Sequence, residues 1–244
     1  MKRELSFTPV DLRTWNRGEV FVYFSQMAPT GYSLTVKVDV TRMKAALDEA
    51  GLKFFPAYVW LVTKVLNRQQ AFRMAEKDGQ TGFYSHLTPL YATFHEQDKT
   101  FSLMWTEYDE DFGAFYEGYL FNQQTYGANQ GILARKDTLP PPNAYTVSCV
   151  PWISFAHFAV HSYNKPYYFP SVEAGRFVCE NGRLMLPLSI TCHHAATDGY
   201  HVSLFLGQLQ AEADAFAQYI VHGPDDTNEK IGGTAVPPNA TDEF

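Results

Sequence analysis

The sequence predicts an α/β fold, a two-layer α/β sandwich with one large mixed sheet and helices packed on it. Residues 32–40 alternate between apolar and polar side chains, which is the period-two pattern of a half-buried strand. Residues 56–67 and 198–220 instead place their apolar side chains at helical spacing. Strands and helices follow one another along the chain without strict alternation, which favours a mixed sheet.

The first half of the chain supplies several of these elements. Residues 19–24 (EVFVYF) are predicted to form a strand, and residues 41–50 a short helix that ends at Gly51. Pro56 lies near the start of the second, very apolar helix. Residues 91–94 and 101–105 are predicted to be neighbouring strands across a polar turn. A helix over residues 109–126 and a surface loop over 127–143 follow.

The second half contains a hairpin and a broken strand. Residues 145–155 (YTVSCVPWISF) are predicted to form a strand that Pro151 interrupts, because a proline there implies an edge strand or a break in pairing. Residues 163–170 form an aromatic loop. The dipeptide Asn181-Gly182 predicts a tight hairpin between residues 176–180 and 183–192, since both turn positions favour these residue types.

Length and charge narrow the class of protein. The 244 residues are expected to form one domain over residues 1–221, followed by a polar, disordered tail over 222–244. A hydrophobic content of 45% is typical of a well-packed globular protein. The formal net charge of −7 argues against binding to nucleic acids or to an anionic membrane surface.

The cysteines and the N-terminus indicate a cytoplasmic protein. Cys149, Cys179 and Cys192 form no CxxC pair, and their odd number gives no disulfide framework. The basic start lacks the apolar segment of a signal peptide, and no window reaches the roughly 18 apolar residues of a membrane span.

The sharpest chemical signal is the HHxxxDG pattern at residues 193–199. An apolar alternating run leads into it and a helical pattern follows, so His194 is expected where a strand ends and Asp198 at a helix N-cap. A neutral imidazole there can accept a proton from a hydroxyl group. For His193 we favour a structural role, and for Asp198 a cap or an ion pair rather than catalysis.

Other kinds of site fit the sequence less well. As metal ligands the candidates are His193, His194, Asp198 and His201. Adjacent residues of a strand point to opposite faces, so His193 and His194 are not expected to share an ion, and no HExxH motif is present. Ser148 and Cys149 are candidate nucleophiles, but neither lies in a G-x-S-x-G elbow. A serine on an interrupted strand can instead donate its hydroxyl to an oxyanion, although most such serines are structural.

Several separate stretches together resemble one family. They are residues 15–19 (WNRGE), 31–35 (GYSLT), 73–75 (RMA), 93–95 (TFH), 100–102 (TFS), 151–152 (PW) and 184–202 (LMLPLSITCHHAATDGYHV). In this order the chain resembles the chloramphenicol acetyltransferases of the classical trimeric type, over about residues 7–218. The motif alone also occurs in other acyl-CoA and carrier-dependent acyltransferases, so the fold it implies is CoA-dependent acyltransferase-like.

The resemblance implies transfer of an acetyl group from acetyl-CoA, the cosubstrate, to a hydroxyl of chloramphenicol, without a metal. The residue matching the family's general base is His194. The residue matching the serine that stabilises the tetrahedral intermediate is Ser148, and Asp198 matches the aspartate that pairs with an N-terminal arginine, here Arg17. The family forms homotrimers with sites between subunits, the histidine coming from one subunit and much of the pocket from the next.

The resemblance also identifies pocket positions and departures from the family pattern. Phe101 matches a pocket phenylalanine, and Phe24, with Tyr23 beside it, aligns where the family often has a pocket tyrosine. Thr197 replaces a cysteine of the motif. Other departures are Trp105, where some members have a smaller residue, and Thr146, where an asparagine can stand.

The sequence therefore predicts a cytoplasmic, trimeric chloramphenicol O-acetyltransferase that inactivates the antibiotic. Two alternatives stay open. One is an acyltransferase of the same fold that acts on another hydroxylated acceptor, and the other is a non-catalytic protein that binds an aromatic ligand. The latter has no need of a general base, so the His-Asp-Ser set argues against it.

Overall fold

The computed structural model describes residues 4–161 and 167–222, and the predicted tail lies outside them except for His222. The helical elements are α1 (Gly18–Val22), the π-helix η1 (Tyr23–Met27), α2 (Thr41–Glu49), α3 (Phe54–Asn67), the 3-10 helix η2 (Gln70–Arg73), α4 (Phe112–Tyr126) and α5 (Gly199–His222). The strands are β1 (Phe7–Pro9), β2 (Gly31–Asp39), β3 (Met74–Lys77), β4 (Gln80–Tyr84), β5 (Thr88–His95), β6 (Thr100–Trp105), β7 (Ala144–Val150), β8 (Ser171–Gly175), β9 (Val178–Glu180) and β10 (Arg183–His193).

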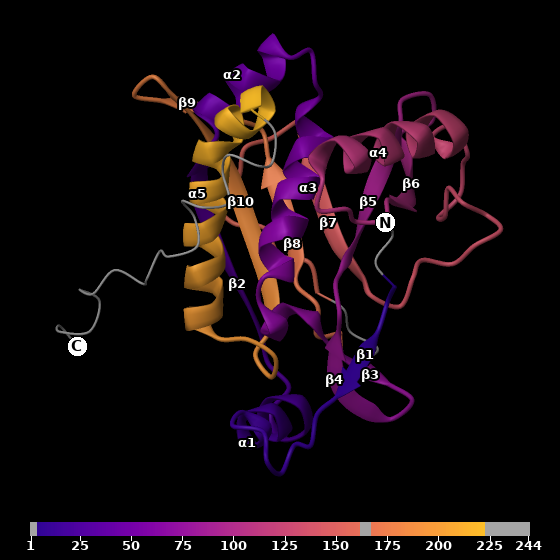
Figure 1. The fold of residues 1–244 in the computed structure, drawn as a ribbon, viewed down its shortest axis with the longest axis vertical. Helices are drawn as coiled ribbons and strands as arrows, with labels where there is room; N and C mark the ends of the chain where they lie inside the picture. Colours follow the sequence, from indigo (N-terminus) through magenta and orange to yellow (C-terminus); the bar gives the residue numbers. More distant parts are fainter. Residues whose placement is uncertain (1–3, 162–166, 223–244) are drawn as a thin grey trace.

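The large sheet is mixed, as the sequence predicts. Its strands lie in the order β2-β10-β8-β7-β5-β6, with β9 pairing with β10. Strands β5, β7 and β8 run parallel, and the other pairs are antiparallel. Strands β1, β4 and β3 form a separate small sheet. Figure 1 shows α3 and α5 in front of the large sheet, so helices and sheet form the two predicted layers.

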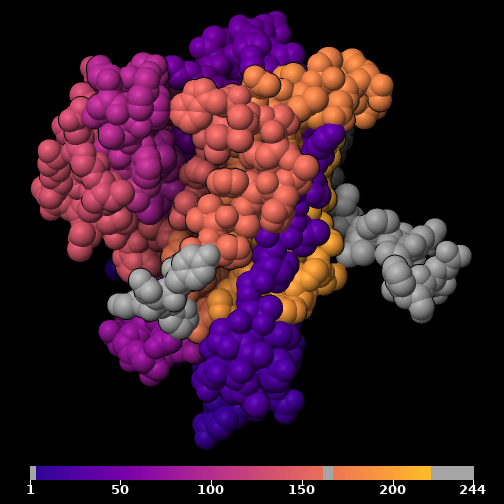
Figure 2. Space-filling view, turned by 180° about the vertical axis from the view of Figure 1, so that it is seen from behind, coloured from indigo at the N-terminus to yellow at the C-terminus, as the bar shows by residue number. Residues whose placement is uncertain are grey.

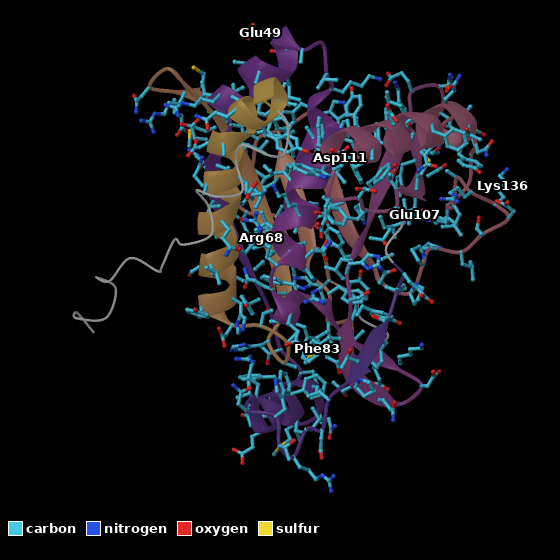
Figure 3. All side chains as sticks on the ribbon, viewed as in Figure 1. Glu49, Arg68, Phe83, Glu107, Asp111 and Lys136 are labelled. Carbon is cyan, nitrogen blue, oxygen red and sulfur yellow. The ribbon has the colours of Figure 1, made fainter. Side chains whose placement is uncertain are left out.

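One face of the large sheet packs on these helices. Every second residue of β10, including Leu188 and Ile190, joins a core with Val59 and Val62 of α3 and Phe205 of α5. The two helices are tied by Glu212 of α5, which is buried and forms ion pairs with Lys64, at 2.9 Å, and with Arg68 of α3. Figure 3 places Arg68 between these helices.

The opposite face of the sheet is covered in part by the chain after β7. The main chain of Phe158 accepts a hydrogen bond from Ser189 of β10, and Ile153 accepts one from the backbone of Arg176 at 2.7 Å. Gly175 has no room for a side chain, because a Cβ there would lie 2.9 Å from the Phe155 ring. Figure 2 shows this face, where the salmon segment before residue 160 lies beside the indigo strand β2.

Most local predictions are confirmed. Strand β2, helices α2 to α4 and the β5–β6 pair occupy the expected segments. The hairpin turns at Asn181 and Gly182, whose φ angles of 51° and 77° are those a type I′ turn requires. Asp198 precedes α5 and accepts a hydrogen bond from the backbone of Tyr200, so it is the N-cap.

The prediction of a strand over residues 19–24 is wrong. This segment forms α1 and the start of η1. Its β-branched and aromatic residues favour a strand by composition, but helical geometry puts Phe21 and Phe24 on one side, three residues apart. Phe21 packs on Tyr168, with ring centroids 5.2 Å apart, and Phe24 packs on His194. Tertiary packing therefore overrides the local preference.

Pro151 ends a strand instead of interrupting one. Strand β7 stops at Val150 and pairs with β5 on one side and β8 on the other, so it is not an edge strand. The expected break in pairing is thus present, and the alternative of an edge strand is wrong.

Candidate active site

His194 lies immediately after β10, in the turn that leads into α5. Its backbone N–H donates to the carbonyl of Thr30 at 2.8 Å, which fixes the turn to the segment before β2. Its ring Nδ1 lies 3.0 Å from the carbonyl oxygen of Thr197. A carbonyl can only accept, so Nδ1 carries a proton, and in the neutral imidazole the lone pair is then on Nε2. Nε2 is thereby the atom that can accept a proton from a substrate.

Two aromatic rings hold the imidazole in place. Phe24 stacks on it with centroids 4.1 Å apart, and Tyr32 of β2 meets it edge-on at 5.3 Å. The Tyr32 hydroxyl donates to Oγ1 of Thr197 at 3.1 Å. Burial is the main cause that raises the pKa of Tyr32, so this hydroxyl keeps its proton. Thr197 therefore anchors the turn with its side chain and orients His194 with its carbonyl.

Arg17 and Asp198 form the ion pair that the resemblance implies. Nη1 of Arg17 lies 2.5 Å from Oδ2 of Asp198, while Oδ1 lies 2.9 Å from Nδ1 of His201. Burial raises the pKa of Asp198, but hydrogen bonds and charges from Arg17 and His201 outweigh it and lower the pKa below 3.8. The carboxylate is therefore ionised at neutral pH. It joins α1, the turn and α5.

His193 is half-buried, and among the described residues its ring forms no hydrogen bond or ring contact with Arg17, Asp198 or His201; its contacts are with Ala195 and Tyr168. Its Nδ1 accepts a hydrogen bond from the backbone of Ala195 at 3.2 Å, and its ring meets Tyr168 at 5.0 Å. Burial, followed by the neighbouring His194, lowers its pKa. A neutral, hydrogen-bonded imidazole of this kind fits the structural role expected for His193.

Ser148 lies elsewhere on the sheet. It is directly opposite Glu173 of β8, which is opposite Ser189 of β10. His194 follows Ser189 by five positions, so two strand spacings and five residue rises separate Ser148 from His194 by roughly 15–20 Å. Ser148 and His194 of one chain therefore do not reach the same reacting atom.

Some of the predicted pocket residues lie near His194, and another lies on the sheet face that carries Ser148. Phe24 and Tyr23 lie beside His194, and their own rings meet at 5.0 Å. Phe101 is opposite Phe94, on the sheet face that carries Ser148, and both are exposed. Phe94 contacts the exposed ring of Trp152 at 4.9 Å. One chain thus places the predicted site residues in two separate groups: His194 with Phe24 and Tyr23, and, on the outer face of the sheet, Ser148 on β7 and Phe101 on β6.

The two other departures from the family pattern lie toward the β5–β6 side of the sheet. Trp105 is buried, and the guanidinium of Arg135 covers its ring at 4.4 Å. Thr146 is half-buried on the face of Ser148, opposite Leu90 of β5.

Sequence reasoning gave Tyr32 and Glu173 no role, and it weighed His201 only as a possible metal ligand. Tyr32 and His201 flank the motif residues in space, and the GYS and DGYH stretches that carry them were visible only as parts of the resemblance. Glu173 was missed altogether. The one signal for it is a lone carboxylate among small and apolar residues in the segment SVEAG.

Over residues 4–161 and 167–222, no group of three or more His, Cys, Asp or Glu side chains is arranged to hold a metal ion. No helix in this part of the chain is long and apolar enough to cross a membrane.

Comparisons with known proteins agree with the resemblance. The family model for chloramphenicol acetyltransferase matches residues 5–210. The chain belongs to the chloramphenicol acetyltransferase family. A chloramphenicol acetyltransferase from Vibrio anguillarum is 38% identical over 224 residues, covering 91% of this chain and all of that protein. One from Staphylococcus aureus is 35% identical, covering 86% of this chain and 97% of that protein.

Solved structures show the same fold. A chloramphenicol acetyltransferase structure superposes with a TM-score of 0.74 at 23% identity, covering 84% of this chain and 99% of that one. The truncated catalytic core of a 2-oxoacid dehydrogenase complex from Thermoplasma acidophilum follows with a TM-score of 0.62 at 15% identity, covering 82% and 95%. The expected acyltransferase-like fold and the assignment to an acyltransferase family are therefore confirmed.

Proposed function

We propose that this member of the chloramphenicol acetyltransferase family transfers the acetyl group of acetyl-CoA to a hydroxyl of chloramphenicol. Relatives named for this activity support the acceptor and the acetyl group that is transferred. The observation that carries the chemistry is the hydrogen bond from Nδ1 of His194 to the carbonyl of Thr197, because it leaves Nε2 as a proton acceptor. Acetylation of the antibiotic in the cytoplasm would inactivate it.

In this mechanism, Nε2 of His194 takes the proton of the acceptor hydroxyl, and the oxygen attacks the thioester carbonyl. The carbonyl carbon becomes tetrahedral and its oxygen carries a negative charge. Ser148 donates its hydroxyl proton in a hydrogen bond to this oxyanion. Collapse of the intermediate breaks the carbon–sulfur bond, and the CoA thiolate takes the proton that His194 holds.

The separation of the two groups of residues supports active sites shared between copies, and the family resemblance supports three copies. Because Ser148 and His194 lie roughly 15–20 Å apart in one chain, a common reaction centre requires His194 from one copy and Ser148 from another. Phe101, exposed on the face of Ser148, would then line the acceptor pocket against Phe24 and Tyr23 of the neighbouring copy.

The first test is release of thiol from acetyl-CoA with and without chloramphenicol. We expect release that depends on chloramphenicol, a loss of about 10²–10⁴-fold in His194→Ala, and a loss of about 10²-fold in Ser148→Ala. Glu49→Gln, at an exposed position on α2 (Figure 3), should match wild type. Near-wild-type turnover by His194→Ala would refute the assigned base.

Shared sites are tested by mixing the two inactive variants. If His194→Ala and Ser148→Ala chains assemble at random, about a quarter of the sites combine an intact His194 with an intact Ser148, and activity returns to about that fraction. If each site belongs to one chain, the mixed assemblies stay inactive.

A second acceptor is tested in the same assay. Trp105 and Thr146 are the departures that could reshape the pocket, so a panel of hydroxylated acceptors belongs beside chloramphenicol. Thiol release with another alcohol alone would favour a related acyltransferase. No release with any acceptor, by a folded trimer, would favour a binding protein.

A further inference from the structure

Glu173 is a buried carboxyl group on the sheet face that carries Ser148. Its side chain is 0% exposed, and it is the residue directly opposite Ser148 in the parallel β7–β8 pair. Paired residues of adjacent strands share a face and lie about 4.8 Å apart, so the two side chains are neighbours. On its other side, Glu173 is opposite Ser189 of β10, which is opposite Thr35 of β2.

The carboxyl group is only half satisfied. One oxygen, Oε1, accepts a hydrogen bond from Ser171 of its own strand. The other, Oε2, is buried without a hydrogen-bond partner among the described residues. Thr191 of β10, which is opposite Ser171 of β8, also has a buried hydroxyl without a hydrogen-bond partner among the described residues. Buried polar groups are rarely left unpaired, so a free Oε2 beside Ser148 points to a ligand group that it meets there.

The side chains that face Glu173 from the sheet are serine hydroxyls. Ser148 faces it from β7, Ser189 from β10 and Ser171 from β8, while the overlying segment contributes main chain at Phe158 and an exposed His157 that contacts Thr35. No cation or second carboxylate contributes to the titration of Glu173 among the described residues.

These surroundings favour the protonated carboxyl. Burial raises the pKa of Glu173 from 4.5 to about 7, and the hydrogen bond from Ser171 offsets only part of this. Two further titratable groups, Tyr58 and Cys192, lie on the helix-covered face. Burial is the largest cause that raises the pKa of each, and the charge of Glu173 adds to it, so both stay neutral when Glu173 ionises.

We propose that Glu173, in its protonated form, is a catalytic residue that donates a hydrogen bond from Oε2 to the oxyanion of the acetyl-transfer intermediate, beside the hydroxyl of Ser148. This inference rests on the proposed function, because the oxyanion is that of the reaction described above. A neutral carboxylic acid in an apolar site is a strong donor to an oxyanion, whereas a carboxylate would repel it. The proton stays on Glu173 throughout, while His194 carries the proton of the acceptor hydroxyl to the thiolate.

The test is the pH dependence of kcat/KM for wild type, Glu173→Gln and Glu173→Ala. Wild type should lose activity as pH rises through about 7 and beyond, because Glu173 then loses the donated proton. Glu173→Gln keeps a neutral N–H donor at every pH, so its descending limb should disappear and its activity should exceed wild type at pH 9. Glu173→Ala should lose about 10²-fold at pH 6.5. Glu49→Gln is the matched control and should show the wild-type profile.

A measurement independent of turnover accompanies the kinetics. The infrared carbonyl stretch of a protonated carboxyl should appear in wild-type trimer at pH 6, vanish as pH rises, and be absent from Glu173→Gln. Unfolding midpoints of the variants separate loss of catalysis from loss of fold.

The outcomes distinguish the two proposals. If His194→Ala is inactive but Glu173→Gln keeps the descending limb of wild type, Glu173 is not the donor and the proposed function stands. If Glu173→Gln loses activity only in proportion to the dissociation of its trimer, and the assembled fraction keeps the wild-type pH profile, Glu173 belongs to the subunit interface and the inference is overturned. A wild-type protein without acetyl transfer overturns both.

Discussion

Replacing Asp198 with Asn separates the charge of this residue from its other contacts. Asn is nearly the same size and is itself a favoured N-cap, so it can still accept from the backbone of Tyr200. It loses the negative charge that faces Arg17 and His201, and an NH2 group replaces the oxygen that accepts the hydrogen bond from Arg17. The variant therefore measures what the ion pair contributes to the turn that carries His194.

The cost in stability follows from the burial of the pair. The Arg17 side chain is 19% exposed and that of Asp198 is 33% exposed, and Nε and Nη2 of Arg17 are buried without partners among the described residues. Breaking a fully buried pair costs about 3–5 kcal/mol, while exposed pairs contribute about 0.2–1 kcal/mol. This partly buried pair lies between these limits, so we expect Asp198→Asn to lower the free energy of unfolding by roughly 2 kcal/mol.

The same change should reduce activity. Asp198 follows Thr197, whose carbonyl fixes the proton of His194, and a shift of about 1 Å in a reacting group can cost about 10²-fold in rate. Urea unfolding followed by tryptophan fluorescence gives the loss of stability, and thiol release gives kcat. The control is Asp48→Asn, which breaks an exposed pair with Lys44 and should cost less than about 0.5 kcal/mol.

The stability difference between wild type and Asp198→Asn should also depend on pH. The folded protein lowers the pKa of Asp198, so the stabilisation is present above the ordinary carboxyl pKa of 3.8 and is lost as pH falls through the lowered value. The difference between wild type and Asp198→Asn should therefore shrink in acid. If Asp198→Asn matches Asp48→Asn in both unfolding midpoint and kcat at pH 7, the ion pair does not support the site.

Three further perturbations test other parts of the structure. Phe24→Ala removes the ring that stacks on His194 with centroids 4.1 Å apart, and it should lower kcat about 5–10-fold with little change in KM for acetyl-CoA. An unchanged kcat would show that this ring does not orient the base. Gly18→Ala places a Cβ 1.7 Å from the carbonyl oxygen of Leu12, so it should lower the free energy of unfolding in urea by about 1–3 kcal/mol. Wild-type stability would contradict the close approach of Leu12 to Gly18. Glu173→Gln should remove a pH dependence of stability. Folding raises this pKa from 4.5 to about 7, so the full contribution to the stability of the folded state is present below pH 4.5. The free energy of unfolding of wild type should therefore fall by on the order of 3 kcal/mol as pH rises from 4.5 through 7. An equal fall in Glu173→Gln would show that other groups cause this pH dependence.

Much of the fold and one half of the site were predictable because their signals are local. Strand β2 alternates with period two, helix α3 is marked by its proline and apolar residues, and the Asn181-Gly182 turn has one favoured backbone geometry. The turn from His193 to Asp198 was predictable for the same reason, because the end of a strand and the cap of a helix are both recognisable from a sequence pattern a few residues long. The residues of this turn keep the expected arrangement.

Residues 19–24 show where local signals fail. Their composition favours a strand, but the partners that select a helix are Tyr168 and His194, more than 140 positions away. A local sequence pattern contains no information on such distant partners. Their packing decides the structure because strand and helix propensities differ by only about 1 kcal/mol, less than the packing energy of two aromatic rings.

The sequence by itself determined the longer helices and strands, although not α1, together with the family resemblance and the chemical type of His194. The tertiary structure decided which side chains share a face, because strand order and register join segments that are distant along the chain. It placed Glu173 beside Ser148 and buried it, which no feature of the segment SVEAG specifies. It also placed Ser148 far from His194 in one chain, so that two copies are required to bring the proposed base and the proposed oxyanion donors together.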